Sequence, residues 1–219
     1  VGKGYGTDLR DTRSVAILLE PAAERGIGML SFIYDDGARD NETWLYLSAL
    51  GRVKRIASGS SDDETEPGSL FGSEFTTEDQ DTGKLDEYEI NLLEETVQAG
   101  REVWKIETIP NAERARKSRY SRTVLYVDKE RFVELRIEMY DQYGKEIKRM
   151  LGSRVEQMNG IWVARSTTIM NLVTNRLSNM AFLEMHTGIE VPDEFLTQRT
   201  LTDAAFRETE LEKLRAQIN

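Results

Sequence analysis

The sequence has no cysteine and only one histidine, His186, among its 219 residues. Without cysteine there are no disulfide bonds, thiolate metal sites or cysteine nucleophiles within these residues. His186 lies in an alternating strand-like pattern, where a structural histidine is more common than a catalytic one. A zinc site would need carboxylates for nearly all its other ligands. We therefore expect no metal, no cofactor and no enzymatic chemistry. A hydrolase that uses His186 is a minor alternative, which an esterase screen would test.

Long hydrophobic runs are also missing, since the longest, Val15 to Leu19, is far shorter than the ~20 apolar residues of a membrane helix. The chain starts at Val1 with no basic-then-apolar leader. We expect an exported protein whose signal peptide lies outside this chain.

Positive charge is in deficit, with a formal net charge of −10. This balance argues against a nucleic-acid partner, because phosphate binding favours a basic surface. Much of the negative charge falls between Ser58 and Gly83, a stretch without lysine or arginine. Its part Asp62–Glu66 lacks the regular spacing and the glycine of a calcium loop. We expect Ser58–Glu66 to be a mobile, solvated loop with no apolar anchor.

Alternation of apolar and polar residues is the dominant pattern, and it predicts antiparallel strands joined by short turns. The turn signals are Asp36-Gly37, Ala99-Gly100, Tyr143-Gly144 and Asn159-Gly160. The expected strands are Ser14–Glu20, Ile27–Tyr34, Glu42–Ser48, Arg52–Ala57, Tyr88–Val97, Glu102–Ile109, Thr123–Val127, Val133–Met139, Lys145–Gln157, Ile161–Leu172 and Arg176–Glu190. We predict a mainly β protein with a single strongly curved antiparallel sheet, an incomplete open barrel, in one domain over residues 1–219.

Helix is scarce in this pattern. We expect a C-terminal helix at 203–218, capped by Thr202 or Asp203, and a turn or two of helix within Thr76–Leu85.

Two further expectations concern side-chain direction. In the strand at 133–139 the apolar residues should point to the core and the alternating polar residues to solvent. The core set is Val133, Leu135, Ile137 and Met139, and the solvent set is Glu134, Arg136 and Glu138. Trp44 and Trp104 lie in runs that are apolar on both faces, so both should be largely buried on neighbouring parts of the same sheet.

Two motifs in the centre of the chain resemble those of a known family. "WLYLSALGRVKRI" is similar to the signature W-L-Y-L-P-A-L-x-R-V-R-R-I of the outer membrane lipoprotein-sorting, or LolA-like, proteins, with Ser48 in place of proline. "GSLFGSEFTTED", Gly68 to Asp79, resembles the family's G-S-F-x-G-S-D-F-[ST]-x-E-D. Further similar segments are "LLEPAAERGIGMLSF", "YSRTVLYVDKERFVELRIEMYDQYGKEIK", "NGIWVARSTTIMN" and "VPDEFLTQRTL". The family's usual N-terminal helix and first strands do not appear, and the helix after Asp203 extends past the usual end.

The resemblance implies an open antiparallel barrel whose hollow is covered by helices and loops. The residues implied to bind the ligand are Trp44, Tyr46, Leu47, Phe71, Phe75, Trp104 and Met139. The residues implied to form the lid and the rim of the hollow are Arg52, Lys54, Arg55, Glu74, Glu78 and Asp79. In this arrangement the acidic lid, Gly68–Asp79, pairs with the basic rim, and Phe71 and Phe75 are mostly buried against the sheet. Whether the lid opens as a gate or closes the core permanently is left open.

The resemblance also implies a location and a role. The family belongs to the Gram-negative periplasm, and its expected role is to carry a hydrophobic ligand, such as a lipoprotein acyl chain or another lipid, without chemistry. The alternative is an accessory module that docks on an inner-membrane transporter of the RND type, suggested by the acidic loop and the extra helix.

Overall fold

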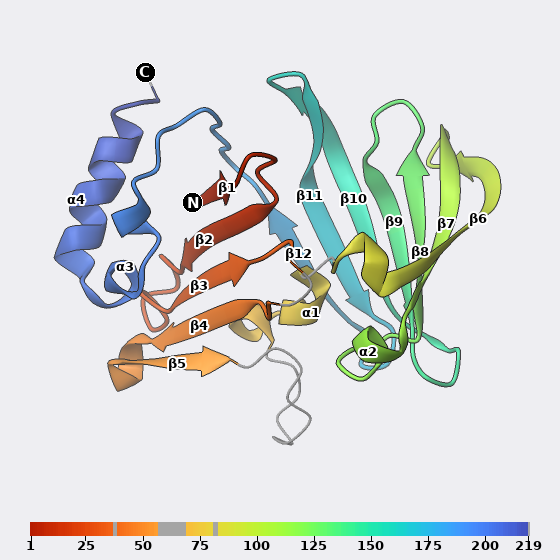
Figure 1. Ribbon diagram of the computed structural model, residues 1–219, viewed down its shortest axis with the longest axis horizontal. Coiled ribbons are helices and arrows are strands. Elements are labelled where there is room, and N and C mark those ends of the chain that lie inside the picture. Colours follow the sequence, from red (N-terminus) through yellow and green to blue (C-terminus); the bar gives the residue numbers. More distant parts are fainter. Residues whose placement is uncertain (37–38, 57–68, 81–82, 219) are drawn as a thin grey trace. The chain divides into compact units, whose positions relative to one another are not determined.

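The computed structural model describes residues 1–36, 39–56, 69–80 and 83–218 (Figure 1). Its strands are β1 (Gly2–Tyr5), β2 (Asp11–Ile17), β3 (Gly28–Ile33), β4 (Glu42–Leu47), β5 (Arg52–Ile56), β6 (Tyr88–Gln98), β7 (Arg101–Pro110), β8 (Arg122–Asp128), β9 (Glu134–Tyr140), β10 (Glu146–Met158), β11 (Ile161–Asn171) and β12 (Arg176–Ala181). The α-helices are α1 (Thr77–Gln80), α2 (Ala112–Ala115), α3 (Gln198–Thr202) and α4 (Ala204–Arg215). Short 3₁₀ turns are η1 (Ser48–Leu50), η2 (Leu70–Gly72), η3 (Leu85–Glu87) and η4 (Asp193–Phe195). None of the helices in these ranges is both long and apolar enough to cross a membrane.

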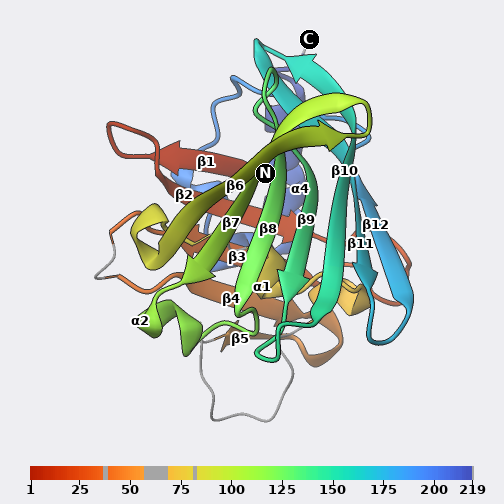
Figure 2. The same ribbon diagram turned by 90° about the vertical axis from the view of Figure 1, so that its right-hand side faces the viewer.

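The chain divides into two compact units, each with its own sheet and core. The first, Val1–Ser60 with His186–Asn219, contains the five-stranded sheet β1-β2-β3-β4-β5. The second, Ser61–Met185, contains the seven-stranded sheet β12-β11-β10-β9-β8-β7-β6, seen face-on in Figure 2. In both sheets every neighbour in space is a neighbour in sequence, as expected for strands joined by short antiparallel turns.

The five-stranded sheet is covered on one face by the C-terminal segment (Figure 1). The fully buried side chains of Leu30, Phe195, Leu196 and Leu201 form the centre of this core. The Asp203 carboxylate caps α4 by accepting a hydrogen bond from the backbone N–H of Phe206 at 3.0 Å, so of the two predicted caps, Thr202 and Asp203, the second is the one used.

The seven-stranded sheet owes its order to tight turns. At the predicted turns Ala99-Gly100 and Asn159-Gly160 both residues have positive φ (49° and 77°, 47° and 83°), which is the geometry of type I′ hairpins. These turns fix the registers of β6 with β7 and of β10 with β11.

The predicted fold class is confirmed in its main features: mainly β, antiparallel, not closed into a barrel, with a C-terminal helix. The strands divide between two sheets, however, where the sequence predicted a single one. The physical reason lies between β5 and β6, where the described residues 69–80 and 83–87 carry η2, α1 and η3 and no strand that could continue the ladder. The predicted loop at Ser58–Glu66 and the candidate calcium segment Asp62–Glu66 lie outside the described residues.

The two ends of the strand series differ from the sequence prediction. Strand β1 was not predicted, because Gly2–Tyr5 is short and has two glycines. The strand expected at Arg176–Glu190 ends at Ala181, since β12 pairs with β11 only as far as Ser166.

The predicted register of β9 is correct for the buried apolar residues and wrong for one acid. Leu135 and Met139 are buried, and Glu134 is exposed. Glu138 is also buried, on the opposite face of the sheet, where it accepts a hydrogen bond from the Tyr140 hydroxyl at 2.7 Å and pairs with Arg136. Aromatic rings and the aliphatic parts of long side chains can cover a carboxylate on a sheet face that the alternating pattern predicts to be solvent-exposed.

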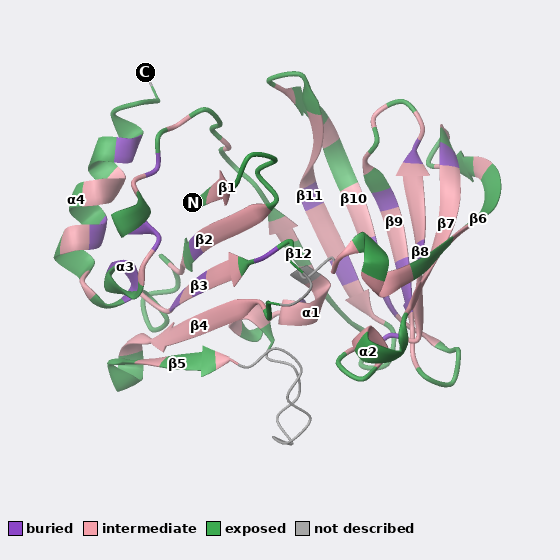
Figure 3. Ribbon diagram, viewed as in Figure 1, coloured by how far each residue is buried: buried purple, intermediate pink, exposed green. Residues whose placement is uncertain are grey.

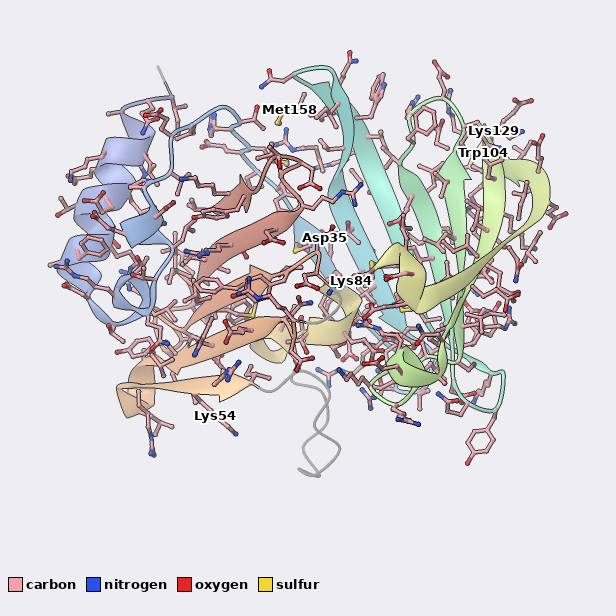
Figure 4. All side chains as sticks on the ribbon, in the orientation of Figure 1. Asp35, Lys54, Lys84, Trp104, Lys129 and Met158 are labelled. Atoms are coloured by element: carbon pink, nitrogen blue, oxygen red, sulfur yellow. The ribbon has the colours of Figure 1, made fainter. Side chains whose placement is uncertain are left out.

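Trp44 and Trp104 are both half-buried and lie in different sheets, so the expectation that they share one sheet was wrong. Trp44 packs edge-on against Phe32 in the five-stranded sheet, with ring centroids 5.0 Å apart. Trp104, marked in Figure 4, lies on β7 with its ring 5.8 Å from that of Phe132. A run of residues that is apolar on both faces therefore predicted that each tryptophan packs against other side chains, but it did not predict to which sheet each tryptophan belongs.

Asp128 organises the turn that joins β8 to β9. Its carboxylate accepts hydrogen bonds from the Arg101 guanidinium at 2.8 Å and 3.2 Å and from the backbone N–H groups of Glu130 and Arg131. The hydrogen bond to Arg101 is the main reason that the pKa of Asp128 is lowered from 3.8 to about 2.

The lowered pKa of Asp128 predicts an acid-sensitive contribution to stability. The unfolded chain takes up a proton at this carboxyl before the folded protein does. The contribution is therefore complete above pH ~4 and is lost as the pH falls towards ~2. In Asp128→Asn the free energy of unfolding should be lower at neutral pH and should fall less steeply between pH 4 and pH 2 than in the wild type. Chemical denaturation across this range measures it, and parallel pH profiles for the two proteins would contradict it.

Leu201 provides the corresponding test of the first core. Its side chain is fully buried, and truncation to alanine leaves a cavity that the surrounding β-sheet cannot fill. Leu201→Ala should lower the free energy of unfolding by about 2–5 kcal/mol. Leu50→Ala, at a leucine that is 57% exposed, is the control and should change it by less than about 0.5 kcal/mol. Equal losses in the two variants would show that the C-terminal segment does not form this core.

Candidate functional site: an apolar row across the seven-stranded sheet

The registers of the seven-stranded sheet align large aliphatic side chains in a single row. Paired residues on adjacent antiparallel strands point to the same face of a sheet. The row runs Leu92 (β6), Ile106 (β7), Leu125 (β8), Ile137 (β9), Met150 (β10) and Ile169 (β11), each residue paired with the next. We call this set the apolar row.

Burial along the apolar row is graded. Ile169 is fully buried and Met150 is 8% exposed, whereas Leu92 at the β6 end is 60% exposed. Figure 3 shows the same trend, with buried residues on β9 to β11 and mostly exposed colouring along β6. Leaving an aliphatic row open at one end costs the fold part of its hydrophobic stabilisation, about 25 cal/mol per Å² of surface left in water.

The buried end of the row is covered by the segment 69–80, which we call the cover segment. Its Leu70 and Phe75 pack in one cluster with Met139, Met150 and Ile169, and Phe75 is only 4% exposed. The predicted burial of Phe75 against the sheet is therefore correct. Phe71 is half-buried and adopts a left-handed backbone conformation with φ 54°, which turns the chain before Phe75.

Asp79 holds the cover segment on the sheet through a buried ion pair. Its carboxylate has no solvent-exposed surface and lies 2.7 Å from the Nζ of Lys148 on β10. The same carboxylate accepts hydrogen bonds from the Tyr120 hydroxyl at 2.5 Å and from the backbone N–H and hydroxyl of Thr76 at 2.7 Å and 2.8 Å. Burial, together with the nearby negative charge of Asp79, raises the pKa of Tyr120 above its usual range.

Two further acids fasten the cover segment at other points. The Glu78 carboxylate accepts hydrogen bonds from the Ser118 hydroxyl at 2.6 Å and the Arg119 backbone N–H at 3.1 Å, and burial raises its pKa. The Glu74 carboxylate accepts one from the Asn171 side-chain amide at 2.8 Å and pairs with Arg176 at 3.2 Å.

These contacts show which partners the three acids have within their own unit. Glu74, Glu78 and Asp79 each have partners there, and their predicted pairing with Arg52, Lys54 and Arg55 of the other unit stays a prediction. The three cations lie exposed on β5, where Arg55 pairs with Glu42 at 2.6 Å.

The residues predicted to bind the ligand come from both units. Phe75 and Met139 belong to the cluster under the cover segment. Trp44 and Tyr46 pack against the core of the five-stranded sheet, and Leu47 lies half-buried on the same strand. Trp104 lies beside Phe132 on the seven-stranded sheet.

The sequence reasoning missed most of the apolar row. Ile137 was expected in the core, but Leu92, Ile106, Leu125, Met150 and Ile169 were not singled out as a site. Each lies in an ordinary alternating strand, and only the pairing registers place them side by side. A signal could have been found in the hairpin turns, which fix the register of neighbouring strands.

A small pocket opens beside the middle of the row, with a volume of about 130 Å³. Ile137 and Met150 form one of its walls, and Gly152 lies against the backbone of Glu134. A Cβ at position 152 would lie 2.4 Å from the carbonyl oxygen of residue 134, so only glycine fits there. Drug-sized ligands occupy pockets of ~300–1,000 Å³, so this space suits a small chemical group and not a whole lipid.

The remaining candidate for chemistry is the single histidine. His186 is exposed and lies after β12, outside any strand. Within the described ranges no group of three or more histidine, aspartate and glutamate side chains is arranged to hold a metal ion.

Comparisons with known proteins agree with this architecture. A family model described as "Uncharacterized protein" matches residues 10–203. A crystal structure of a DUF1329 family protein from Desulfovibrio piger superimposes with a TM-score of 0.82 and 26% identity, covering 91% of this chain and 81% of the other. The chain belongs to the LolA-like family.

Two other structures extend the comparison of this LolA-like chain. A domain from Vibrio parahaemolyticus described as outer membrane lipoprotein-sorting gives a TM-score of 0.80 at 25% identity, over 92% of this chain and 82% of that one. A LolA superfamily protein from Nitrosomonas europaea shares the fold alone, with a TM-score of 0.58 at 16% identity over 84% and 76%. No curated protein matches the sequence.

The buried pair in the cover segment generates a prediction for stability. Asp79→Asn leaves the Lys148 ammonium buried without its counter-charge. Lys148→Met leaves the Asp79 carboxylate buried without a positive partner. Each single change should lower the free energy of unfolding by about 3–5 kcal/mol. The double variant should lose less than the sum of the two, because neither charge is then left alone.

The measurement is a double-mutant cycle by chemical denaturation. Hydrogen exchange of the backbone amides in the cover segment should accelerate in both single variants. Additive losses, with exchange unchanged, would mean that the ion pair does not hold the segment.

Proposed function

We propose that the protein is a binding and carrier protein for a hydrophobic ligand, which it holds on the apolar row without chemical change. The ligand is an acyl chain of a lipoprotein or another lipid. The observation that carries the proposal is the open end of the row: a continuous aliphatic surface extends from a buried core to Leu92, which is 60% exposed. Exposed apolar surface of this kind is characteristic of binding sites.

The similarity to lipoprotein-sorting and LolA superfamily structures supports the same role. It also supports the Gram-negative periplasm as the location. On this proposal the protein acts by binding alone, and its partners are the ligand and the components that deliver and receive it.

The structure also suggests how the ligand is admitted. The cover segment is anchored by a buried ion pair and by Glu74 and Glu78, so we propose that it stays in place as a fixed plug over β9 to β12. The ligand then occupies the β6 to β8 part of the row, with Trp104 on the same strand as Ile106.

The alternative is an accessory module that docks on an inner-membrane transporter of the RND type. The C-terminal helix was one reason for it. Leu211 and Leu214 of α4 instead pack against the helix's own sheet, so the apolar face of this helix is used within the fold. The carrier role is therefore the one that the described residues favour.

Binding of an apolar fluorescent dye tests the proposal. Diphenylhexatriene should bind the purified, delipidated protein, and Leu92→Gln should weaken binding by about tenfold, since burying one leucine side chain contributes ~1.5–3 kcal/mol. Native mass spectrometry of gently purified protein should show an associated lipid.

The matched control is Leu177→Gln. Leu177 is 67% exposed and also lies on an edge strand of this sheet, but it pairs with Met170, next to the row residue Ile169, and so points to the opposite face. It should leave dye binding unchanged. Equal effects of the two substitutions, or no bound lipid and no dye binding, would refute the proposal.

A further inference from the structure

The pocket beside the apolar row contains an acid, Glu134, that has no partner in the part of the chain that the structure describes. Its lining consists of Val133, Glu134, Ile137, Met150, Gly152, Ala164 and Thr167. Among the described residues, no hydrogen bond or ion pair is formed by the Glu134 carboxylate. The other carboxylates near this face, Asp79 and Glu74, each have a cation and further donors. The Glu134 carboxylate and the Thr167 hydroxyl are therefore the polar groups that the pocket can offer to a ligand.

The position of Glu134 relates it to the proposed ligand. Glu134 pairs with Val127 on β8 where the register of the two strands shifts, and at this irregularity its side chain lines the pocket together with the row residues Ile137 and Met150. Ile137 and Met150 belong both to the row and to the pocket wall. A chain lying on the row can therefore reach the pocket with its polar end, and the volume of about 130 Å³ suits a small headgroup.

We propose that this pocket recognises the polar end of an amphiphilic ligand that carries a hydrogen-bond donor, an amine or a hydroxyl, and that it disfavours a carboxylate or phosphate end. The proposal rests on the hydrophobic carrier role and adds the chemical class of the headgroup. A carboxylate accepts hydrogen bonds and attracts cations, whereas a second anion beside it is repelled.

The surroundings of the carboxyl agree with this assignment. The side chain of Glu134 remains accessible to solvent, but the protein around it displaces water and raises its pKa. A donor bound at the carboxylate would replace the lost water and stabilise the charged form. The aliphatic walls of Val133, Ile137 and Ala164 make such a hydrogen bond stronger than it would be in bulk water.

The experiment uses amphiphiles that differ only at the polar end. Hexadecylamine, hexadecanol and palmitate, each kept below its micelle concentration, compete with diphenylhexatriene for the whole protein. The wild type should bind the amine or the alcohol on the order of tenfold more tightly than palmitate. Glu134→Gln, which keeps the shape and removes the charge, should abolish most of the preference. Thr167→Val should reduce the affinity for the alcohol.

Glu102→Gln is the matched control. It removes another carboxylate of the same sheet, outside the pocket, whose side chain forms no hydrogen bond with any residue in the described ranges. It should leave all affinities unchanged, and thermal unfolding should confirm that every variant is folded. An effect on the amine alone identifies a cationic headgroup, and one on the alcohol alone identifies a neutral donor; both support the proposal.

Other results overturn it in distinguishable ways. If the three amphiphiles bind equally, or if Glu134→Gln leaves the preference intact, the carrier role stands and the headgroup assignment is wrong. If none displaces the dye and the dye itself does not bind, the carrier role fails as well.

Discussion

The cover over the seven-stranded sheet depends on one buried carboxylate. Asp79 has no contact with water, and it meets Lys148, Tyr120 and Thr76 within hydrogen-bonding distance. A buried ion pair is costly to desolvate, so it adds little net stability over an apolar pair of the same shape. Its effect is specific: only one position of the cover segment satisfies every partner of Asp79. That position places Phe75 on Met139, Met150 and Ile169 and closes one end of the apolar row.

Because the cover segment buries one end of the apolar row, the other end can be exposed with less risk of aggregation. A row of aliphatic side chains that was exposed along its whole length would favour aggregation, because both the apolar face and the β6 edge would be available to other chains. Here the row is anchored in a core at β11 and becomes exposed only towards β6. At that edge Glu94 and Glu95 pair with Lys105 and Lys129, which places charge where another strand would have to add. The proposed site is thus the exposed part of the apolar row, which continues from the buried core beyond the edge of the cover segment.

Binding without chemistry also explains the distribution of the charged groups. Most acids on the seven-stranded sheet are satisfied: Asp128 by Arg101, Glu138 by tyrosine hydroxyls, and Asp79 by Lys148. Such pairs fix turns and segments. Glu134 differs because it is placed beside the row and has no partner among the described residues, which is why it suggests recognition of a ligand and not a structural role.

Local patterning was sufficient for much of the fold. Alternation predicted most strands within a few residues, Asn159-Gly160 predicted its hairpin, and Asp203 predicted the cap of α4. These features depend on residues close in sequence, through backbone conformation and short hydrogen bonds. The motif resemblance correctly indicated the family and the covering role of Phe75.

Tertiary structure alone decided the rest. The partition into two sheets, the partners of Glu74, Glu78 and Asp79, and the burial of Glu138 all depend on groups far apart in sequence. The apolar row is the clearest case, since nothing in the local sequence distinguishes its members from the other apolar residues of their strands. A shift of one residue in any register would send that strand's apolar side chain to the other face. Residue types along the chain determined that such a face exists, and the registers between strands determined which side chains share it.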